Sequence, residues 1–223
     1  IWKNKISVLM GDFILSKALI NMVGLKDFDA LDLISRTAEK LSAGEIMQIE
    51  KSLTRNMPKN VYYDMINQKT ASLIAASCEL GAITTTKVST DRKSTFDYGE
   101  NLGMAFQIKD DLFDFLGSEN QTGKDHGGDV KKNMLTLPLI YSIENASRTG
   151  RNRIKSLVRK KKKSVKILKE INDIIYDSGG FDYAKKKLDE FSDKATDSIS
   201  SYAESEIKKS LINLVIFNKE RVG

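Results

Sequence analysis

The scarcity of proline is the feature that most limits what this chain can fold into. Only two prolines, Pro58 and Pro138, occur among the 223 residues, and proline is the residue that most strongly interrupts a helix. Helix-forming residues fill the stretches between them, whereas the alternating Val, Ile and Thr runs that mark strands are hard to find. We therefore predict an all-α fold. With 40% hydrophobic residues, the chain can bury one core, so we expect a single domain over residues 1–223.

The hydrophobic pattern predicts long helices separated by short turns. The first of them is apolar nearly all around, with small residues at Ser16 and Ala18, so we expect it to be a central helix. The third contains many small residues, which would let a neighbouring helix approach closely or leave room for an apolar ligand. The expected helices cover approximately residues 6–22, 30–53, 60–81, 90–116, 136–143, 154–158, 165–178, 183–201 and 204–217.

The stretch FQIKDDLFDF, Phe106–Phe115, contains three carboxylates at Asp110, Asp111 and Asp114. Their spacing would bring them together on one turn of helix, where like charges disfavour the helix by about 0.2–0.5 kcal/mol per pair. Many helices expose acidic faces to water, but the residues around these acids are mostly apolar, and buried carboxylates need partners. Carboxylates without His or Cys form the hard-ligand set that suits Mg²⁺. We therefore predict a metal site here.

Composition excludes several classes of protein. A single cysteine, Cys78, rules out an internal disulfide framework, which favours a reducing cytoplasm. No apolar run approaches membrane-spanning length, so we expect no transmembrane segment. The formal charge is +6, but its excess lies in basic runs at residues 159–163 and 185–187, which are typical of solvated faces. Aromatic residues do not alternate with these charges, so we expect no nucleic-acid partner.

Other polar residues have two possible readings each. Lys69 and Thr70 lie at the polar end of the small-residue phrase and could serve a site, although Lys69 alone resembles an ordinary surface lysine. Glu45 and Gln48 are expected on an exposed polar face. The glycine-rich segment 117–133 reads as a loop whose lysines, Lys124, Lys131 and Lys132, could face a diphosphate. The only histidine, His126, has no partner and is not expected to be catalytic.

Five phrases together resemble one family. They occur in the order found in the trans-isoprenyl diphosphate synthases, also called polyprenyl synthetases, and the match extends from the first residue to about Ser142. Each phrase alone would be weak, whereas their agreement is specific. The phrases are GDFILSKAL at Gly11–Leu19, GExxQ at Gly44–Gln48, KT at Lys69–Thr70, FQIKDDLFDF at Phe106–Phe115, and GK followed by GD and TLPL at residues 123–139.

This resemblance implies an isoprenoid synthase-like bundle of long helices around a deep apolar cavity, and a homodimer. It implies that Mg²⁺ bridges Asp110, Asp111 and Asp114 to the diphosphate of an allylic substrate. The matched substrate-binding positions are Lys69, Thr70, Gln107 and Lys124, and those expected to be catalytic are Lys69, Gln107 and Asp110.

The implied reaction ionises an allylic diphosphate, such as geranyl or farnesyl diphosphate. The double bond of isopentenyl diphosphate then attacks the cation and a proton is lost, giving a longer all-trans polyprenyl diphosphate.

The sequence departs from the family pattern in two places. The first aspartate-rich motif belongs upstream of Gly11, so we expect the chain to be N-terminally incomplete. Met134 stands where the family usually has a lysine, and Lys131 or Lys132 could replace that contact.

Two alternatives follow from these departures and from the motif itself. One is a non-catalytic helical subunit of a heteromeric prenyl synthase, although the intact acidic cluster argues against it. The other is a terpene cyclase, but in that class the second metal motif normally mixes Asn, Ser and Glu, so the all-Asp motif favours chain elongation.

Overall fold

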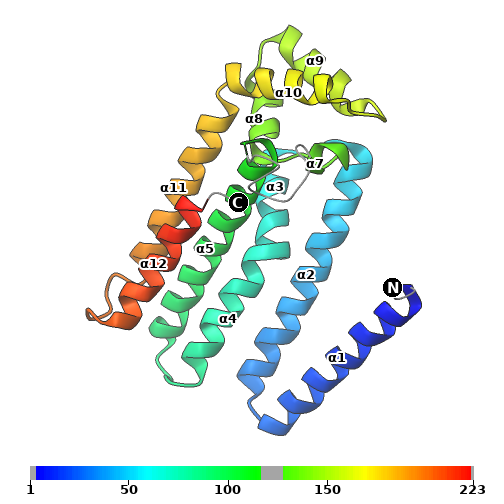
Figure 1. Ribbon diagram of the computed structural model, residues 1–223. Helices are drawn as coiled ribbons and strands as arrows, with labels where there is room; N and C mark the ends of the chain where they lie inside the picture. Colours follow the sequence, from blue (N-terminus) through cyan, green and yellow to red (C-terminus); the bar gives the residue numbers. More distant parts are fainter. Residues whose placement is uncertain (1–3, 117–127, 222–223) are drawn as a thin grey trace.

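The computed structural model describes residues 4–116 and 128–221, and within them the regular structure is helical throughout, without a strand. The predicted all-α class is therefore confirmed. Figure 1 shows the long helices side by side, with α9 and α10 lying across one end of the bundle. The helices are α1 (Asn4–Leu25), α2 (Phe28–Thr54), α3 (Lys59–Ile66), the π-helix η1 (Asn67–Ala71), α4 (Ser72–Ile83), α5 (Ser89–Leu116), α7 (Gly128–Lys131), α8 (Leu137–Asn145), α9 (Arg148–Arg159), α10 (Val165–Asp177), α11 (Gly180–Ser198) and α12 (Glu206–Glu220).

The predicted breaks between helices occur where local chemistry requires them. Pro58 immediately precedes α3, and Pro138 lies in the first turn of α8, where its missing N–H leaves no helix bond unmade. Gly179 separates α10 from α11 and has φ 76°, a left-handed conformation that glycine adopts without strain.

The helix α5 lies between α4 and α11 and carries the centre of the core. Its packing against α4 is close because two glycines face two alanines. A Cβ atom added at Gly103 would lie 2.5 Å from the Cα of Ala71, and one at Gly99 would lie 2.7 Å from the Cα of Ala75. The small residues of the third predicted helix thus serve close helix contact at these positions.

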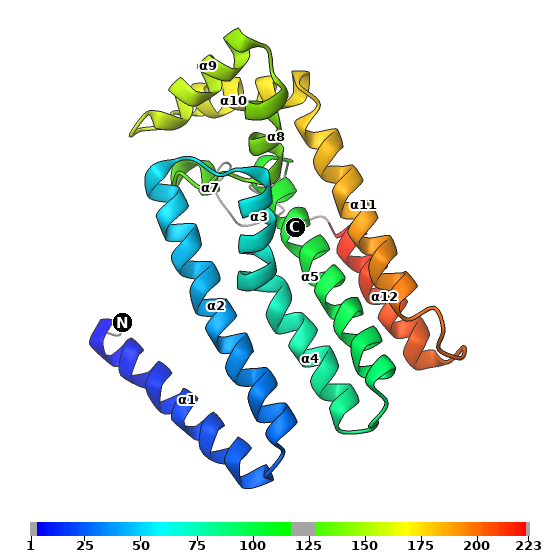
Figure 2. The same ribbon diagram turned by 180° about the vertical axis from the view of Figure 1, so that it is seen from behind.

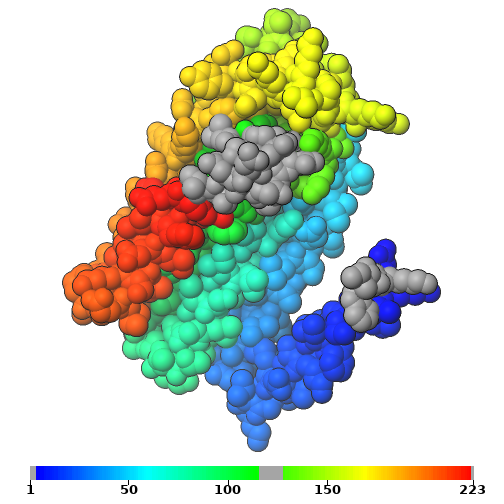
Figure 3. Space-filling model, viewed as in Figure 1, coloured from blue at the N-terminus to red at the C-terminus, as the bar shows by residue number. Residues whose placement is uncertain are grey.

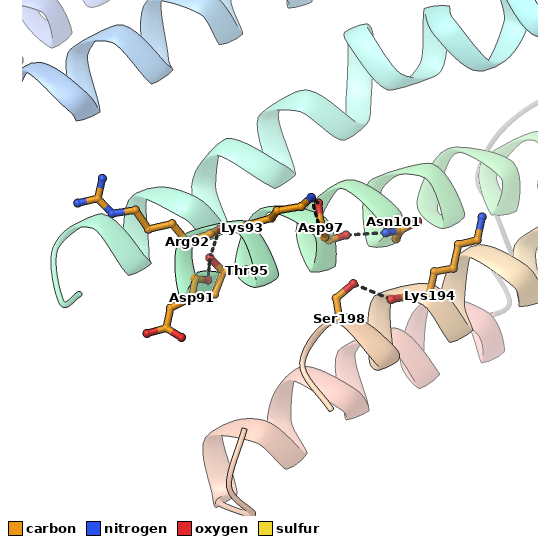
Figure 4. Close-up of polar contacts among 8 residues, drawn as sticks. All are labelled: Asp91, Arg92, Lys93, Thr95, Asp97, Asn101, Lys194 and Ser198. Atoms are coloured by element: carbon orange, nitrogen blue, oxygen red, sulfur yellow. Dashed lines mark hydrogen bonds and ion pairs between the residues drawn. The ribbon is translucent and has the colours of Figure 1, made fainter. Parts of the chain in front are cut away.

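The two halves of α5 differ in how far their charged side chains are exposed to solvent. In the first half, shown in Figure 4, Lys93 pairs with Asp97 one turn later at 2.7 Å on the protein surface. Such exposed pairs contribute only a few tenths of a kcal/mol, roughly 0.3–0.5. In the second half the helix is enclosed by other elements, and Ile108 and Leu112 belong to the core. The aspartates of that half are therefore placed in a very different environment.

The prediction that the first helix is central is wrong. Within the described residues, helix α1 has no buried residue and packs mainly against α2, from which it diverges in both views of the ribbon. Figure 3 shows α1 standing away from the rest of the surface. Its all-round apolar pattern indicates that the helix requires burial, but a pattern cannot say which surface provides it, and the described residues provide only α2.

Helix α1 also contradicts the expectation that no apolar run reaches membrane-spanning length. Helix α1 has 22 residues and, by length and composition alone, could cross a bilayer. A helix buried against protein meets the same two criteria, so the expected absence of a transmembrane segment stays a prediction.

The close contact of α5 with α4 predicts opposite effects for two Gly-to-Ala substitutions. Gly103→Ala places a Cβ against the backbone of Ala71, so we expect it to lower the free energy of unfolding by about 1–3 kcal/mol. Gly81→Ala, also helical but with no atom within 4 Å of the added Cβ, should raise it by about 0.5–1 kcal/mol. Urea unfolding of both variants checks this. Equal effects would show that the contact does not limit packing.

Candidate active site

Asp111 is a buried carboxylate, only 4% exposed, near the end of α5. Its Oδ2 accepts hydrogen bonds from the hydroxyl of Tyr62 at 2.7 Å and from the backbone N–H of Leu137 at 2.9 Å. Its Oδ1 accepts a third from Gln107 Nε2 at 3.3 Å. Because Leu137 is the first residue of α8, Asp111 satisfies a donor at that helix N-terminus, a favourable place for negative charge. One side chain thus joins α3, α5 and α8.

Burial also changes the acidity of Asp111. Removal from water disfavours the charged carboxylate and raises its pKa to about 7, and the nearby Asp129 acts in the same direction. The three hydrogen bonds favour the ionised form and oppose this shift without cancelling it.

Asp114 lies one turn after Asp110 and faces the N-terminus of α7. Its Oδ1 accepts the backbone N–H of Asp129 at 3.0 Å. Its Oδ2 is buried and has no hydrogen-bond partner within residues 4–116 and 128–221. Burial is the main cause that raises the pKa of Asp114, with the charge of Asp129 contributing. An orphaned buried oxygen of this kind is a place where a cation could bind.

Asp110 instead faces Arg221, the residue that follows α12. Its Oδ1 accepts a hydrogen bond from Arg221 Nη2 at 2.6 Å, and the two side chains form an ion pair. The guanidinium carbon of Arg221 lies 4.2 Å from the ring centroid of Phe106 and 5.1 Å from that of Phe113, within cation–π range.

The predicted convergence of three carboxylates is not what the structure shows. Asp110, Asp111 and Asp114 contact three different partners, and no group of three or more potential metal-ligating side chains occurs among the described residues. The physical reason is that Asp111 is turned into the bundle, where Tyr62, Gln107 and the backbone of Leu137 donate to its oxygens. The roles of Asp110, Asp111 and Asp114 as metal ligands stay predictions.

Lys69 is held in the π-helix η1 by two residues of α2. Its Nζ lies 2.8 Å from Glu45 Oε2 and 2.6 Å from Gln48 Oε1. The approach of α2 depends on Gly44, where an added Cβ would lie 2.6 Å from the backbone nitrogen of Lys69. Glu45 is exposed, as expected, and Gln48 is half-buried, but both residues also contact the lysine and so do more than form a polar face. π-Helical turns occur frequently at functional sites.

A chain of hydrogen bonds continues from the next residue. Thr70 Oγ1 donates to Gln107 Oε1 at 2.8 Å, and Gln107 in turn donates to Asp111. The predicted site residues Thr70 and Gln107 are thus brought together with Asp111, and the orientation of the Gln107 amide is set from both sides.

A pocket of about 150 Å³ opens between Lys69 and Asp111. One part of its wall is polar and the other is apolar, as a site for a charged head on a hydrocarbon chain requires. Its lining residues are Gln48, Ser52, Met57, Tyr62, Met65, Ile66, Lys69, Gln107, Asp111, Asp129, Met134, Leu135 and Thr136.

Several residues of this site were not predicted from the sequence to have a role in it. The Thr136 hydroxyl is buried in the pocket wall and has no hydrogen-bond partner within the described residues. Thr136 precedes α8, but its side chain makes no capping hydrogen bond to that helix. Tyr62 and Arg221 are paired with motif aspartates, but neither belongs to a motif, and only spatial proximity could identify them. Asp129 lies in the GD of the loop phrase, and that motif could have identified it as a site residue from the sequence.

The remaining predicted residues are less informative. Lys124 and His126 lie outside the described residues. Lys131 and Lys132 are exposed, and Met134, at the family lysine position, contacts Gln48. Whether either lysine replaces the missing one stays a prediction.

The fold agrees with comparisons to known proteins. The family profile described as Polyprenyl synthetase matches residues 1–175, and the chain belongs to that family. Its structure is similar to the crystal structure of a polyprenyl synthase from Caulobacter crescentus CB15 complexed with calcium and isoprenyl diphosphate. The TM-score is 0.90 at 28% sequence identity, covering 100% of this chain and 68% of that chain.

Curated relatives include plant and bacterial enzymes. The chain is 37% identical over 141 residues to solanesyl diphosphate synthase 3, chloroplastic/mitochondrial, of Arabidopsis thaliana, covering 63% of this chain and 33% of that protein. It is 35% identical over 144 residues to heptaprenyl diphosphate synthase component 2 of Geobacillus stearothermophilus, covering 65% and 45% respectively. The matched part therefore spans less than half the length of each of these two relatives.

The raised pKa of Asp111 predicts a pH-dependent stability. An aspartate in an unfolded chain titrates near about 3.9, so between that value and about 7 the folded protein binds more protons. The free energy of unfolding should therefore fall as the pH rises through this window. Asp111→Asn keeps a hydrogen-bonding side chain but does not ionise.

We expect this variant to gain stability relative to the parent from pH 4 to pH 7, by less than about 1.4 kcal/mol per pH unit. Thermal unfolding across the range in metal-free buffer measures this gain. Asp173→Asn, at an exposed position of α10, serves as the control and should follow the parent. Parallel curves for Asp111→Asn and the parent would contradict the assigned pKa.

Proposed function

We propose that the protein containing this chain is a prenyltransferase. It would join isopentenyl diphosphate to an allylic diphosphate, such as geranyl or farnesyl diphosphate, and release a longer all-trans polyprenyl diphosphate. The observation that carries the proposal is that a member of the polyprenyl synthetase family places Lys69, Gln107 and the end of the aspartate-rich α5 around one half-polar pocket.

Mg²⁺ is the cation we propose for the aspartates. Asp110 and Asp114 lie one helical turn apart, and Asp114 has a buried oxygen without a partner in the described part of the chain. Two carboxylates fit Mg²⁺, which takes its remaining ligands from water and phosphate. Bound there, Mg²⁺ supplies stabilisation of the negative charge that develops on the leaving diphosphate.

The chain's own residues would prepare the remainder of the site. The ammonium of Lys69, fixed by Glu45 and Gln48, would donate to diphosphate oxygens at the pocket, and Gln107, fixed by Thr70, would add a neutral donor. Such donors act strongly because they are already in place when charge develops.

The apolar part of the pocket would protect the reacting carbon chain. Met57, Met65, Ile66 and Leu135 line that side and would keep water from the allylic cation that remains when the C–O bond breaks and the diphosphate leaves with the electron pair. The isopentenyl double bond then forms the new C–C bond, and loss of a proton restores a double bond.

The same chain has a second candidate role, the non-catalytic subunit of a heteromeric synthase. The name of the Geobacillus stearothermophilus relative, heptaprenyl diphosphate synthase component 2, describes one component of an enzyme, which favours a heteromeric assembly without saying which component is catalytic. We also propose a segment carrying a first aspartate-rich motif as the completion of this single domain. The cytoplasmic location stays a prediction.

An elongation assay on the full-length protein distinguishes the two roles. The protein is incubated with Mg²⁺, farnesyl or geranyl diphosphate and labelled isopentenyl diphosphate, and the products are sized by chromatography. A ladder ending at one length is the expected result. Absence of product with every allylic primer, in a folded protein that contains the first motif, would favour the non-catalytic subunit.

Asp110→Ala tests the metal-bearing end of α5 directly. Loss of a metal ligand should lower turnover by about 10²–10³-fold, as for other groups that stabilise developing charge, and should leave helicity nearly intact. Asp173→Ala, an exposed residue of α10, is the matched control and should retain full activity. Unchanged turnover in Asp110→Ala would remove the role assigned to this carboxylate.

We further propose a homodimer in which α1 is covered by a second copy of the protein. The support is the number of large apolar side chains that α1 exposes, among them Phe13, Ile14 and Ile20, each more than half exposed. Isolated exposed apolar residues are normal, whereas a continuous apolar surface of this kind marks an interface.

Ile14→Glu combined with Ile20→Glu should therefore convert a dimer to a monomer. Light scattering after size-exclusion chromatography of the full-length protein measures the mass. Ile207→Glu, at a similarly exposed isoleucine of α12, is the control and should remain dimeric. A double variant that keeps the parent's mass would exclude α1 from the interface.

A further inference from the structure

Arg221 is a basic residue that enters the site from the far end of the chain. It is 111 residues away from Asp110, yet its Nη2 donates to Asp110 Oδ1 at 2.6 Å and to the backbone carbonyl of Phe106 at 3.1 Å. Its side chain is 20% exposed and that of Asp110 is 29% exposed. This is a partly buried, hydrogen-bonded ion pair, so it differs from the solvated pairs on the helix surfaces.

Contacts of the last turn of α12 hold Arg221 at this position. Lys109 Nζ donates to the carbonyl of Lys219 at 2.6 Å, and Lys219 pairs with Asp189 of α11 at 2.9 Å. The backbone N–H of Arg221 bonds the carbonyl of Phe217 at 2.8 Å, which ends α12 beside the last turns of α5. The guanidinium therefore reaches Asp110 from a fixed backbone.

The partners of Arg221 distinguish it from a residue with only a packing role. The guanidinium lies over Phe106 and near Phe113, and its Nε is buried without a hydrogen-bond partner in the described part of the chain. Within residues 4–116 and 128–221, the anionic partner of this cation is Asp110, the first aspartate of the motif. The guanidinium of Arg221 thus occupies a carboxylate that is proposed to bind a metal ion, and the two positive charges compete for it.

We propose that Arg221 is the counter-ion of Asp110 in the free enzyme and that a divalent cation must displace it. The proposal rests on the metal role given to Asp110 above. A bare divalent cation would lose affinity because it has to break this ion pair and then lies close to a positive charge. A cation that arrives with a diphosphate brings anionic oxygens, which give the displaced guanidinium a new partner. Arg221 thereby favours binding of cation and diphosphate together over binding of cation alone.

Two titrations of the full-length protein test this inference. In the first, Mn²⁺ alone is titrated and followed by electron paramagnetic resonance. In the second, Mn²⁺ is titrated in the presence of inorganic diphosphate, with correction for the complex in solution. Arg221→Gln should bind Mn²⁺ alone at least about fivefold more tightly than the parent and should bind it less tightly when diphosphate is present. Changes of this size are typical of coupled binding sites.

Three further variants make the result specific. Arg221→Lys retains the charge and should resemble the parent in the first titration. Arg153→Gln removes an arginine that pairs with Glu170 on the outer helices α9 and α10 and should change neither titration. Asp110→Asn should weaken Mn²⁺ binding in both, which establishes that the titrations report on this carboxylate.

A second measurement guards against a variant that simply loosens α12. In the parent, the NMR signal of the Arg221 side-chain N–H should be shifted by the ring of Phe106, and addition of Mg²⁺ with diphosphate should move it as the guanidinium leaves Asp110. The counter-ion role is wrong if Asp110→Asn weakens Mn²⁺ binding but Arg221→Gln leaves both Mn²⁺ affinities unchanged, and the NMR signal of Arg221 in the parent does not move when Mg²⁺ and diphosphate are added. If Asp110→Asn has no effect on Mn²⁺, the metal role of Asp110 in the proposed function fails instead.

Discussion

The buried carboxylate of Asp111 is the interaction on which the site depends. It joins a tyrosine of α3, a glutamine of α5 and the first backbone N–H of α8, so three helices meet at one side chain. A buried charge needs such partners, because its removal from water otherwise disfavours folding by several kcal/mol. With these three partners in place, the polar wall of the pocket is assembled before any ligand arrives.

Close helix contacts complete this arrangement. Gly99 and Gly103 let α5 lie directly against α4, and Gly44 lets α2 lie against the π-helical turn that contains Lys69. The lysine, the glutamine and the aspartates come from segments that are distant in sequence, and the glycines allow these segments to approach without intervening side chains. The three glycines thus determine how closely these helices pack in the bundle.

Much of the fold could be read from the sequence because its determinants are local. The helical class, the breaks at Pro58, Pro138 and Gly179, and the position of the aspartate-rich helix follow from propensity and periodicity. The difference in burial between Asp111 and its neighbours depends on which elements surround α5, and spacing does not reveal that. The contacts of Glu45 and Gln48 with Lys69 and of Arg221 with Asp110 are equally non-local. For α1, the apolar pattern predicted a central position, whereas the described residues leave the helix exposed.

The π-helical turn at Asn67–Ala71 has a consequence for how this chain can vary. A π turn accommodates one residue more than the α-helical path requires, and each residue of a regular α-helix advances its neighbours by about 100° around the axis. Deletion of a single residue within Asn67–Ala71 would therefore restore a plain α-helical turn, and α3 and α4 would keep the faces that they present now. The same deletion between Ser72 and Ala75, inside α4, would instead turn the rest of that helix by about 100° and take Ala75 away from Gly99. Chain length is therefore less strictly fixed at this turn than in the regular helix that follows it.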